Sequence, residues 1–231
     1  VDAHDAVGVV AAAADDSGVG YLEAAGFQDR EAAVAMREDS IFYIASMTKA
    51  VTSVAAMQCV ERGVLALDAP ISKLLPYLSE PLILGGYDAD GKPLYRRVTT
   101  AITLRHLLTH TSGLAYTTWN LELFEFRQRC ADATPVEGPD LRRAAPLMRE
   151  PGEQWDYGTS TDFVGLAKEA ATGMTLGAYF DEHIFQPLGM ADTRYVVAAT
   201  SAQRVAARYL RDVDGTLLRE PPARAAQGRW P

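Results

Sequence analysis

Ser46 and Lys49 are the two residues in this sequence whose types and spacing best suit covalent chemistry. They occur as Ser-x-x-Lys where a helical pattern begins, so the side chains should lie one turn apart on the same face. A helix start favours negative charge, and a lysine in a partly desolvated pocket loses proton affinity and can accept a serine proton. The pair predicts a serine nucleophile with a lysine base. The same spacing also occurs by chance, and a serine at a helix start often acts only as an N-cap.

Tyr157 is the second candidate for chemistry, because it follows a Pro-Gly turn in a loop and stands directly before Gly158. A loop tyrosine can present its hydroxyl to a cleft. Near a cation such as a lysine ammonium its pKa falls, and the phenol can then carry a proton. The more frequent role of such a tyrosine is to pack its ring and to hydrogen-bond the backbone.

The histidines and cysteines give no competing site. His106, His110 and His183 could suggest a Ser-His-Asp triad, but the sequence has no Gly-x-Ser-x-Gly elbow and no His-Glu-x-x-His. We expect His106 and His110 to lie four residues apart on one short helix and, without a third ligand, to be structural. Cys59 and Cys130 belong to no CxxC or Cys/His cluster, so no zinc site is indicated.

The composition is that of an ordinary globular protein, with 231 residues, 48% hydrophobic and 23% charged. The net charge of −8 disfavours nucleic acid and anionic membranes as partners. No apolar run approaches the roughly 18 residues that span a bilayer, and no signal peptide is visible. We therefore expect a small-molecule substrate, no cofactor, no metal and, with two isolated cysteines, a cytoplasmic location.

The elements that must position these residues are short strands at both ends and a helical block between them. Helical spacing and a closing Gly63 predict a helix over 46–62, and Thr103 is a suitable N-cap for the next one. The predicted hairpins are 7–14 with 19–26, 82–84 with 94–98, and 206–212 with 216–220. The other predicted helices are 104–110, 121–129, 141–149, 161–171 and 176–185.

Four blocks in this order resemble the serine β-lactamase-like superfamily: 44–49 (IASMTK), 105–114 (RHLLTHTSGL), 150–158 (EPGEQWDYG) and 186–190 (QPLGM). The resemblance is closest to family VIII carboxylesterases, which are similar in fold to class C β-lactamases. It implies an α/β (α+β) fold of the β-lactamase/penicillin-binding-protein type, with an antiparallel sheet lobe and a helical lobe. We expect one domain over 1–231, with strands in 1–45, a mainly helical part in 46–190 and a hairpin in 191–231.

The resemblance also implies roles for individual residues. Ser46 would be the acylated nucleophile, and its backbone N–H would form half of an oxyanion hole. Lys49 would be the base or the group that polarises the base. Tyr157 would pass the proton to the leaving alcohol and then activate water. Tyr116 and Trp119 would line the acyl or alcohol pocket.

The sequence departs from the family pattern in two places. Class C β-lactamases carry Tyr-x-Asn, whereas residues 157–159 read Tyr-Gly-Thr, which favours esters over β-lactams. The third motif, a Lys-Thr-Gly, His-Thr-Gly or Trp-x-Gly after Tyr157, is not found. We therefore expect a chain that lacks its C-terminal strands, and a fragment that is poorly stable and weakly active alone.

The function expected from these observations is that of a serine carboxylesterase, which hydrolyses short-chain esters through an acyl-serine. Three alternatives stay open: a β-lactamase or D-alanyl-D-alanine carboxypeptidase/transpeptidase, an acyltransferase that uses an acceptor other than water, and a non-catalytic binding module of the same fold.

Overall fold

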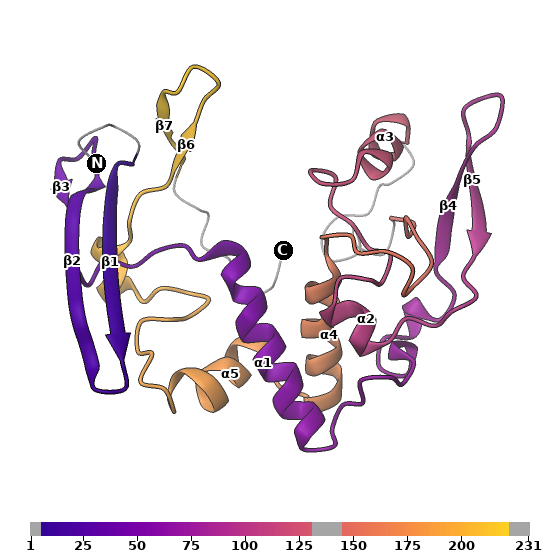
Figure 1. Ribbon diagram of the computed structural model, residues 1–231, viewed down its shortest axis with the longest axis horizontal. Helices are drawn as coiled ribbons and strands as arrows, with labels where there is room; N and C mark the ends of the chain where they lie inside the picture. The colour runs from indigo at the N-terminus through magenta and orange to yellow at the C-terminus, as the bar shows by residue number, and fades with distance from the viewer. Residues whose placement is uncertain (1–5, 131–144, 222–231) are drawn as a thin grey trace. The chain divides into compact units, whose positions relative to one another are not determined.

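The computed structural model describes residues 6–130 and 145–221, which form two compact units (Figure 1). The first unit combines residues 6–45 with 192–221, and the second comprises 46–130 and 145–191. Within the described ranges, no helix combines the length and the apolar character needed to cross a membrane. That the whole chain is a single domain stays a prediction.

The first unit contains an antiparallel sheet in the order β1-β2-β3 and a separate hairpin, β6-β7. The strands are β1 (Gly8–Asp15), β2 (Gly18–Asp29), β3 (Val34–Ala35), β6 (Tyr209–Arg211) and β7 (Leu217–Arg219). The turn between β1 and β2 is set by local chemistry, because the Asp15 carboxylate accepts hydrogen bonds from the Ser17 N–H at 2.8 Å and its hydroxyl at 2.6 Å. Gly18 has φ 125°, a region that other residues rarely adopt. Both predicted hairpins of this unit are confirmed.

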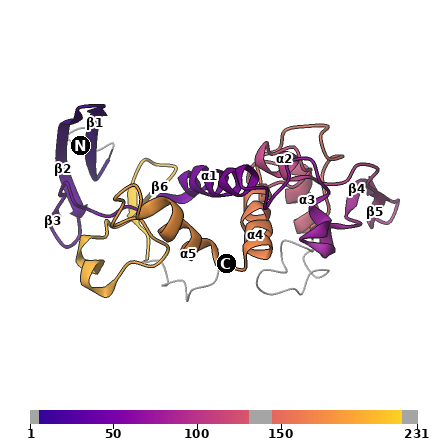
Figure 2. The same ribbon diagram turned by 90° about the horizontal axis from the view of Figure 1, so that it is seen from below.

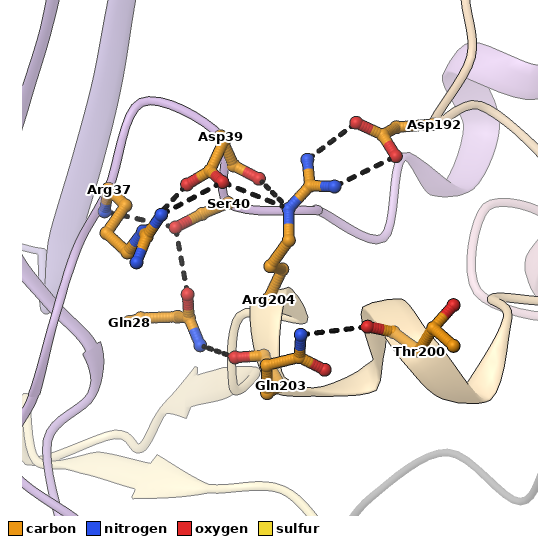
Figure 3. A network of polar contacts seen from close by, with 8 residues as sticks. All are labelled: Gln28, Arg37, Asp39, Ser40, Asp192, Thr200, Gln203 and Arg204. Carbon is orange, nitrogen blue, oxygen red and sulfur yellow. Dashed lines mark hydrogen bonds and ion pairs between the residues drawn. The ribbon is translucent and has the colours of Figure 1, made fainter.

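Arg204 joins the two sequence segments of the first unit (Figure 3). It ends a 3₁₀ segment, Ala199–Arg204, and its guanidinium donates to both carboxylate oxygens of Asp192, at 3.0 and 2.5 Å, and to the Asp39 carbonyl at 2.8 Å. The Arg204 carbonyl accepts from the Ile41 N–H at 2.7 Å. Backbone and side chain together hold the chain near residue 40 against the chain near residue 204.

Gln28 adds a buried polar link to the same junction (Figure 3). Its side-chain amide donates to the Gln203 carbonyl at 2.8 Å and accepts from the Ser40 hydroxyl at 2.9 Å. Because Gln28 is only 4% exposed, losing these bonds would leave polar groups without water to replace the partner. These hydrogen bonds therefore determine which residues meet at the junction and also hold the two segments together.

The second unit is mainly helical and holds most of the buried apolar side chains. Its helices are α1 (Thr48–Glu61), α2 (Leu104–Leu108), α3 (Leu121–Arg129), α4 (Ser160–Thr172) and α5 (Leu176–Phe180), the last continuing as a π-helical turn over Asp181–Phe185. The hairpin β4 (Leu82–Tyr87) with β5 (Pro93–Arg97) lies at the end of the unit away from α1 (Figures 1 and 2).

The core of the second unit is centred where α1 packs against α4 (Figure 1). Ala55, Ala56 and Cys59 on α1 are small and at most 1% exposed, so the two helices can approach closely around Phe163 and Val164 of α4. Cys59 is thus a buried apolar residue, as its sequence context predicts. This packing fixes the N-terminal end of α1, where Ser46 and Lys49 stand, relative to the residues around the start of α4.

The structure corrects two helix predictions. Residues 145–149 are not helical, because Leu147 pairs with the edge of β4: its N–H donates to the Leu82 carbonyl at 2.8 Å and its carbonyl accepts from the Leu84 N–H at 2.9 Å. Residues 141–144 of that prediction lie outside the described residues. The helix expected over 104–110 ends at Leu108, so His110 is not on it and instead has φ 56°.

Candidate active site

Ser46 lies in a 3₁₀ turn, Ala45–Met47, directly before α1. The N-cap of α1 is Met47, so Ser46 is not the cap that local reasoning allowed as an alternative. Lys49 lies in the first turn of α1 and its Nζ donates to the Ser46 Oγ at 3.1 Å. Ala45 has φ 43°, a conformation that is costly for a residue with a Cβ and that recurs at functional sites. The backbone therefore presents the Ser46 hydroxyl at a strained turn beside an amine.

The Tyr157 hydroxyl reaches the same pair from a distant loop. The pKa of Tyr157 is lowered, first by a hydrogen bond with the Ser46 hydroxyl and then, against the effect of burial, by the hydrogen bond and charge of Lys49. The Lys49 Nζ also lies 5.0 Å from the centroid of the Tyr157 ring. The Tyr157 phenol therefore lies beside the Ser46–Lys49 pair.

The protonation of Lys49 differs from the sequence expectation. Burial is the largest single influence and lowers the pKa of Lys49, as expected, but the hydrogen bond to Tyr157 and the charges of Tyr116, Tyr157 and Asp162 outweigh it. The net pKa of Lys49 is raised above its ordinary 10.5. The expectation of a lowered lysine pKa was therefore wrong, because it included the desolvation of Lys49 and left out the hydrogen bond and charges of its neighbouring side chains.

Backbone hydrogen bonds on both sides hold the loop that carries Tyr157. The Asp156 N–H donates to the His110 carbonyl at 2.9 Å, and the Tyr157 carbonyl accepts from the Tyr116 N–H at 3.3 Å. The Gly158 N–H donates to the His110 Nδ1 at 3.4 Å. The chain around residues 110–116 thus sets the position of Tyr157.

Gly158 is required by the close approach of these two segments. A Cβ at this position would lie 2.4 Å from the Cα of Ala115 and 2.6 Å from the Leu114 carbonyl oxygen, both of them backbone atoms. Backbone cannot move aside as a flexible side chain can, so only glycine fits after Tyr157.

Tyr116 and Trp119, expected to line a substrate pocket, have different environments. The Tyr116 ring packs edge-on against the Tyr157 ring at 5.7 Å, and the Lys49 Nζ lies 5.6 Å from its centroid. Burial is the main cause of a raised pKa of Tyr116. Trp119 is 74% exposed, and its N–H donates to the Tyr116 carbonyl at 3.1 Å. The structure brings Tyr116 to Lys49 and Tyr157, and it joins Trp119 to them only through the backbone.

Two aromatic neighbours of Tyr157 were not identified as site residues from the sequence. The Trp155 ring stacks on Tyr157 at 6.2 Å and is 63% exposed. The His110 ring lies 4.9 Å from the Tyr157 ring, and its pKa is lowered first by burial and then by the charge of Lys49. His110 lies in block 105–114 and Trp155 in block 150–158, and this membership was the sequence signal that could have identified them. Among the described residues no cluster of three or more His, Cys, Asp or Glu could hold a metal ion.

Residues 1–228 match the family model described as Beta-lactamase, and the chain belongs to that family. Esterase EstB of Burkholderia gladioli is 41% identical over 203 residues, which are 83% of this chain and 48% of EstB. Acyltransferase mokF of Monascus pilosus is 41% identical over 161 residues, 69% of this chain and 39% of mokF. The structure of simvastatin synthase (LovD) from Aspergillus terreus superposes with a TM-score of 0.84 at 34% identity, covering 96% of this chain and 57% of that one.

These matches confirm the family and the fold class expected from the four sequence blocks. The chain spans about half the length of these relatives. The matched relatives include both esterases and acyltransferases, so the comparisons leave the acyl acceptor and the substrate undetermined.

Proposed function

We propose that the protein is a serine carboxylesterase that hydrolyses short-chain esters through an acyl-Ser46 intermediate. The observation that carries the proposal is the arrangement of three groups: the Ser46 hydroxyl, the Lys49 amine 3.1 Å away, and the Tyr157 phenol, whose ring centroid lies 5.0 Å from that amine and whose pKa is lowered. A nucleophile, a cation and an ionisable phenol close together are the parts that nucleophilic catalysis requires.

In the proposed mechanism Lys49 stays protonated and Tyr157 is the base. The Tyr157 phenolate takes the Ser46 proton while the Ser46 Oγ forms a bond with the ester carbonyl carbon. The bond between that carbon and the alcohol oxygen then breaks, and Tyr157 returns the proton to the leaving alkoxide. This step yields the free alcohol and acyl-Ser46. The Ser46 N–H donates to the developing oxyanion, as one half of the oxyanion hole.

The second half of the cycle repeats the same proton transfers with water. Tyr157 removes a proton from water as the hydroxide oxygen attacks the acyl carbon, and the proton then passes to the departing Ser46 Oγ. The products are the carboxylic acid and free Ser46. Tyr116 and Trp119 are proposed to line the acyl or alcohol pocket.

Transfer of the acyl group to an alcohol in place of water is a second candidate function. The similarity to mokF and to simvastatin synthase supports it. The two functions share acyl-Ser46 and differ only in the acceptor, so they are separated by the product formed when an acceptor alcohol is added.

The test is turnover of p-nitrophenyl acetate and butyrate by the full-length protein and by Ser46→Ala. We expect Ser46→Ala to remain folded and to lose turnover, and mass spectrometry of the unsubstituted protein to detect one acyl group on Ser46. Retained turnover in Ser46→Ala removes Ser46 from the mechanism. Faster turnover of nitrocefin than of esters would instead select the β-lactam alternative, and failure of a fluorophosphonate to label Ser46 would favour the binding module.

A further inference from the structure

Asn120 and Asp156 form a buried side-chain pair, and each is adjacent in sequence to a candidate site residue, Trp119 or Tyr157. The Asn120 Nδ2 donates to the Asp156 Oδ1 at 3.1 Å, and the two residues are 8% and 9% exposed. Asn120 is the only asparagine in the sequence, and Asp156 directly precedes Tyr157. None of the proposed chemical steps uses either side chain.

Asn120 has a fixed orientation, because its other polar atoms are already committed. Its Oδ1 accepts from the Leu123 N–H at 2.9 Å, which caps α3, and its own N–H donates to the Tyr116 carbonyl at 3.0 Å. A carbonyl oxygen must face the Leu123 N–H, so the amide nitrogen must face Asp156. Asn120 thereby connects the start of α3, the Tyr116 loop and the Tyr157 loop.

Asp156 is held at one carboxylate oxygen and at its backbone. Besides the bond from Asn120, its N–H donates to the His110 carbonyl at 2.9 Å. Its Oδ2 is buried and has no hydrogen-bond partner within residues 6–130 and 145–221. A buried carboxylate with one unmatched oxygen is costly to keep. A buried oxygen left in this way calls for an explanation.

We propose that Asn120 and Asp156 are a positioning pair that fixes the Tyr157 phenol on Ser46 and Lys49. This inference rests on the proposed function. The pair ties residue 156 to residue 120, while the bond between the Tyr116 N–H and the Tyr157 carbonyl ties the next residue to the same loop. Two adjacent residues anchored to one loop leave the Tyr157 side chain little freedom to swing. Such freedom matters, since a displacement of about 1 Å can lower a rate about 100-fold.

The test is an exchange of the two side chains, with p-nitrophenyl butyrate as substrate. Asn120→Asp keeps an acceptor for the Leu123 N–H but sets two carboxylates against each other. The double variant Asn120→Asp/Asp156→Asn restores one donor and one acceptor, with the direction of the bond reversed. We expect Asn120→Asp to lower kcat by about 10- to 100-fold with little change in KM, and the double variant to recover to within about threefold of the unsubstituted protein.

The acidic limb of the kcat/KM profile provides a readout that stability alone would not move. If the Tyr157 phenol withdraws from Lys49 in Asn120→Asp, its pKa rises and this limb moves to higher pH, and the double variant should move it back. Thr175→Asp is the matched control, because Thr175 also caps a helix, accepting from the Ala178 N–H at 3.2 Å, at a cap outside the site. We expect kcat of the control to be unchanged.

Asn120→Ser covers the case in which Asn120→Asp does not fold, since it keeps a cap acceptor, adds no charge and loses the donor to Asp156. We expect it to lower kcat in the same direction by a smaller factor. A folded Asn120→Asp or Asn120→Ser with kcat within twofold of the unsubstituted protein would overturn the positioning role. So would a double variant that regains Tm but not kcat. Turnover retained by Ser46→Ala would instead overturn the proposed function, so the two failures are distinguishable.

Discussion

Replacing Tyr157 by Phe tests which group removes the proton from Ser46. The substitution deletes the phenol oxygen and keeps the ring, whose contacts are with His110, Tyr116 and Trp155. The ring packing survives, so the free energy of unfolding should change little. If Tyr157 is the base, the kcat of Tyr157→Phe depends on which other group can accept the Ser46 proton.

Lys49 is the remaining candidate, because its Nζ lies 3.1 Å from the Ser46 Oγ. Its ordinary pKa is 10.5, and the structure raises that value while Tyr157 is present. At a pH three units below the ordinary value, about one lysine in a thousand is neutral and able to accept a proton. Loss of a positioned general base costs about 10² to 10⁴ in rate. For Tyr157→Phe we therefore expect kcat to fall by a factor within that range, equivalent to about 3–5 kcal/mol.

The assay is p-nitrophenyl butyrate hydrolysis by the full-length protein between pH 6 and 9. In Tyr157→Phe the residual rate should climb about tenfold per pH unit, since it would follow the neutral fraction of Lys49. Tyr21→Phe is the matched control: it removes an exposed hydroxyl that donates to Glu23 at 3.0 Å, and it should not change the rate. A Tyr157→Phe enzyme with kcat within threefold of the unsubstituted protein would refute the assignment of Tyr157 as the base.

Three further predictions concern stability and its pH dependence. Gly158→Ala should lower the free energy of unfolding by about 1–3 kcal/mol in urea titrations and also reduce kcat, because its Cβ would lie 2.4 Å from the Ala115 Cα; unchanged stability would contradict the close approach. Gln28→Met should lower the free energy of unfolding by about 1–3 kcal/mol and leave the urea m-value unchanged, because two part-buried hydrogen bonds are lost at similar volume. A neutral effect would show that the junction is not tightly held. Burial lowers the pKa of His110 below its ordinary 6.5, so as pH drops this histidine is protonated in the unfolded chain before it is protonated in the folded one. The free energy of unfolding should therefore fall between about pH 7 and pH 5. His110→Asn should flatten this pH dependence, and an unaltered dependence would assign it to other groups.

Elements whose signals are local were predictable from the sequence. The bounds of α3, Leu121–Arg129, agree with the helical pattern, and the Asp15–Gly18 turn follows from its own side-chain chemistry. The helix predicted near residue 147 failed because the edge of β4, more than 60 residues earlier in the chain, offered that backbone a different set of partners. Competition between a local pattern and a distant strand edge cannot be judged from a single sequence.

The candidate site shows the same division between local and distant information. The spacing of Ser46 and Lys49 on one turn is local and was predicted, whereas the contact between Asn120 and Asp156 joins side chains 36 residues apart. Neither residue type marks such a pair in a sequence, since a buried Asn and a buried Asp are recognisable only once the fold places them. The sign of the Lys49 shift was missed for the same reason, because it depends on Tyr116, Tyr157 and Asp162.

The reversed sign of the Lys49 shift changes the division of roles within the site. A lysine with a lowered pKa would itself be a base, but a lysine held protonated by its neighbours is a fixed positive charge beside the phenol. That charge lowers the pKa of Tyr157, and the Lys49 Nζ donates to the Ser46 oxygen. Protonated Lys49 therefore favours the serine alkoxide as well as the phenolate. The two titrations are therefore coupled, and the acidic and alkaline limbs of a pH profile belong to the pair rather than to one residue each. Lys49→Ala should move the acidic limb to higher pH and lower kcat together, because the Tyr157 phenol loses the neighbouring charge. If Lys49 were itself the base, its loss would instead remove the limb that reports its titration.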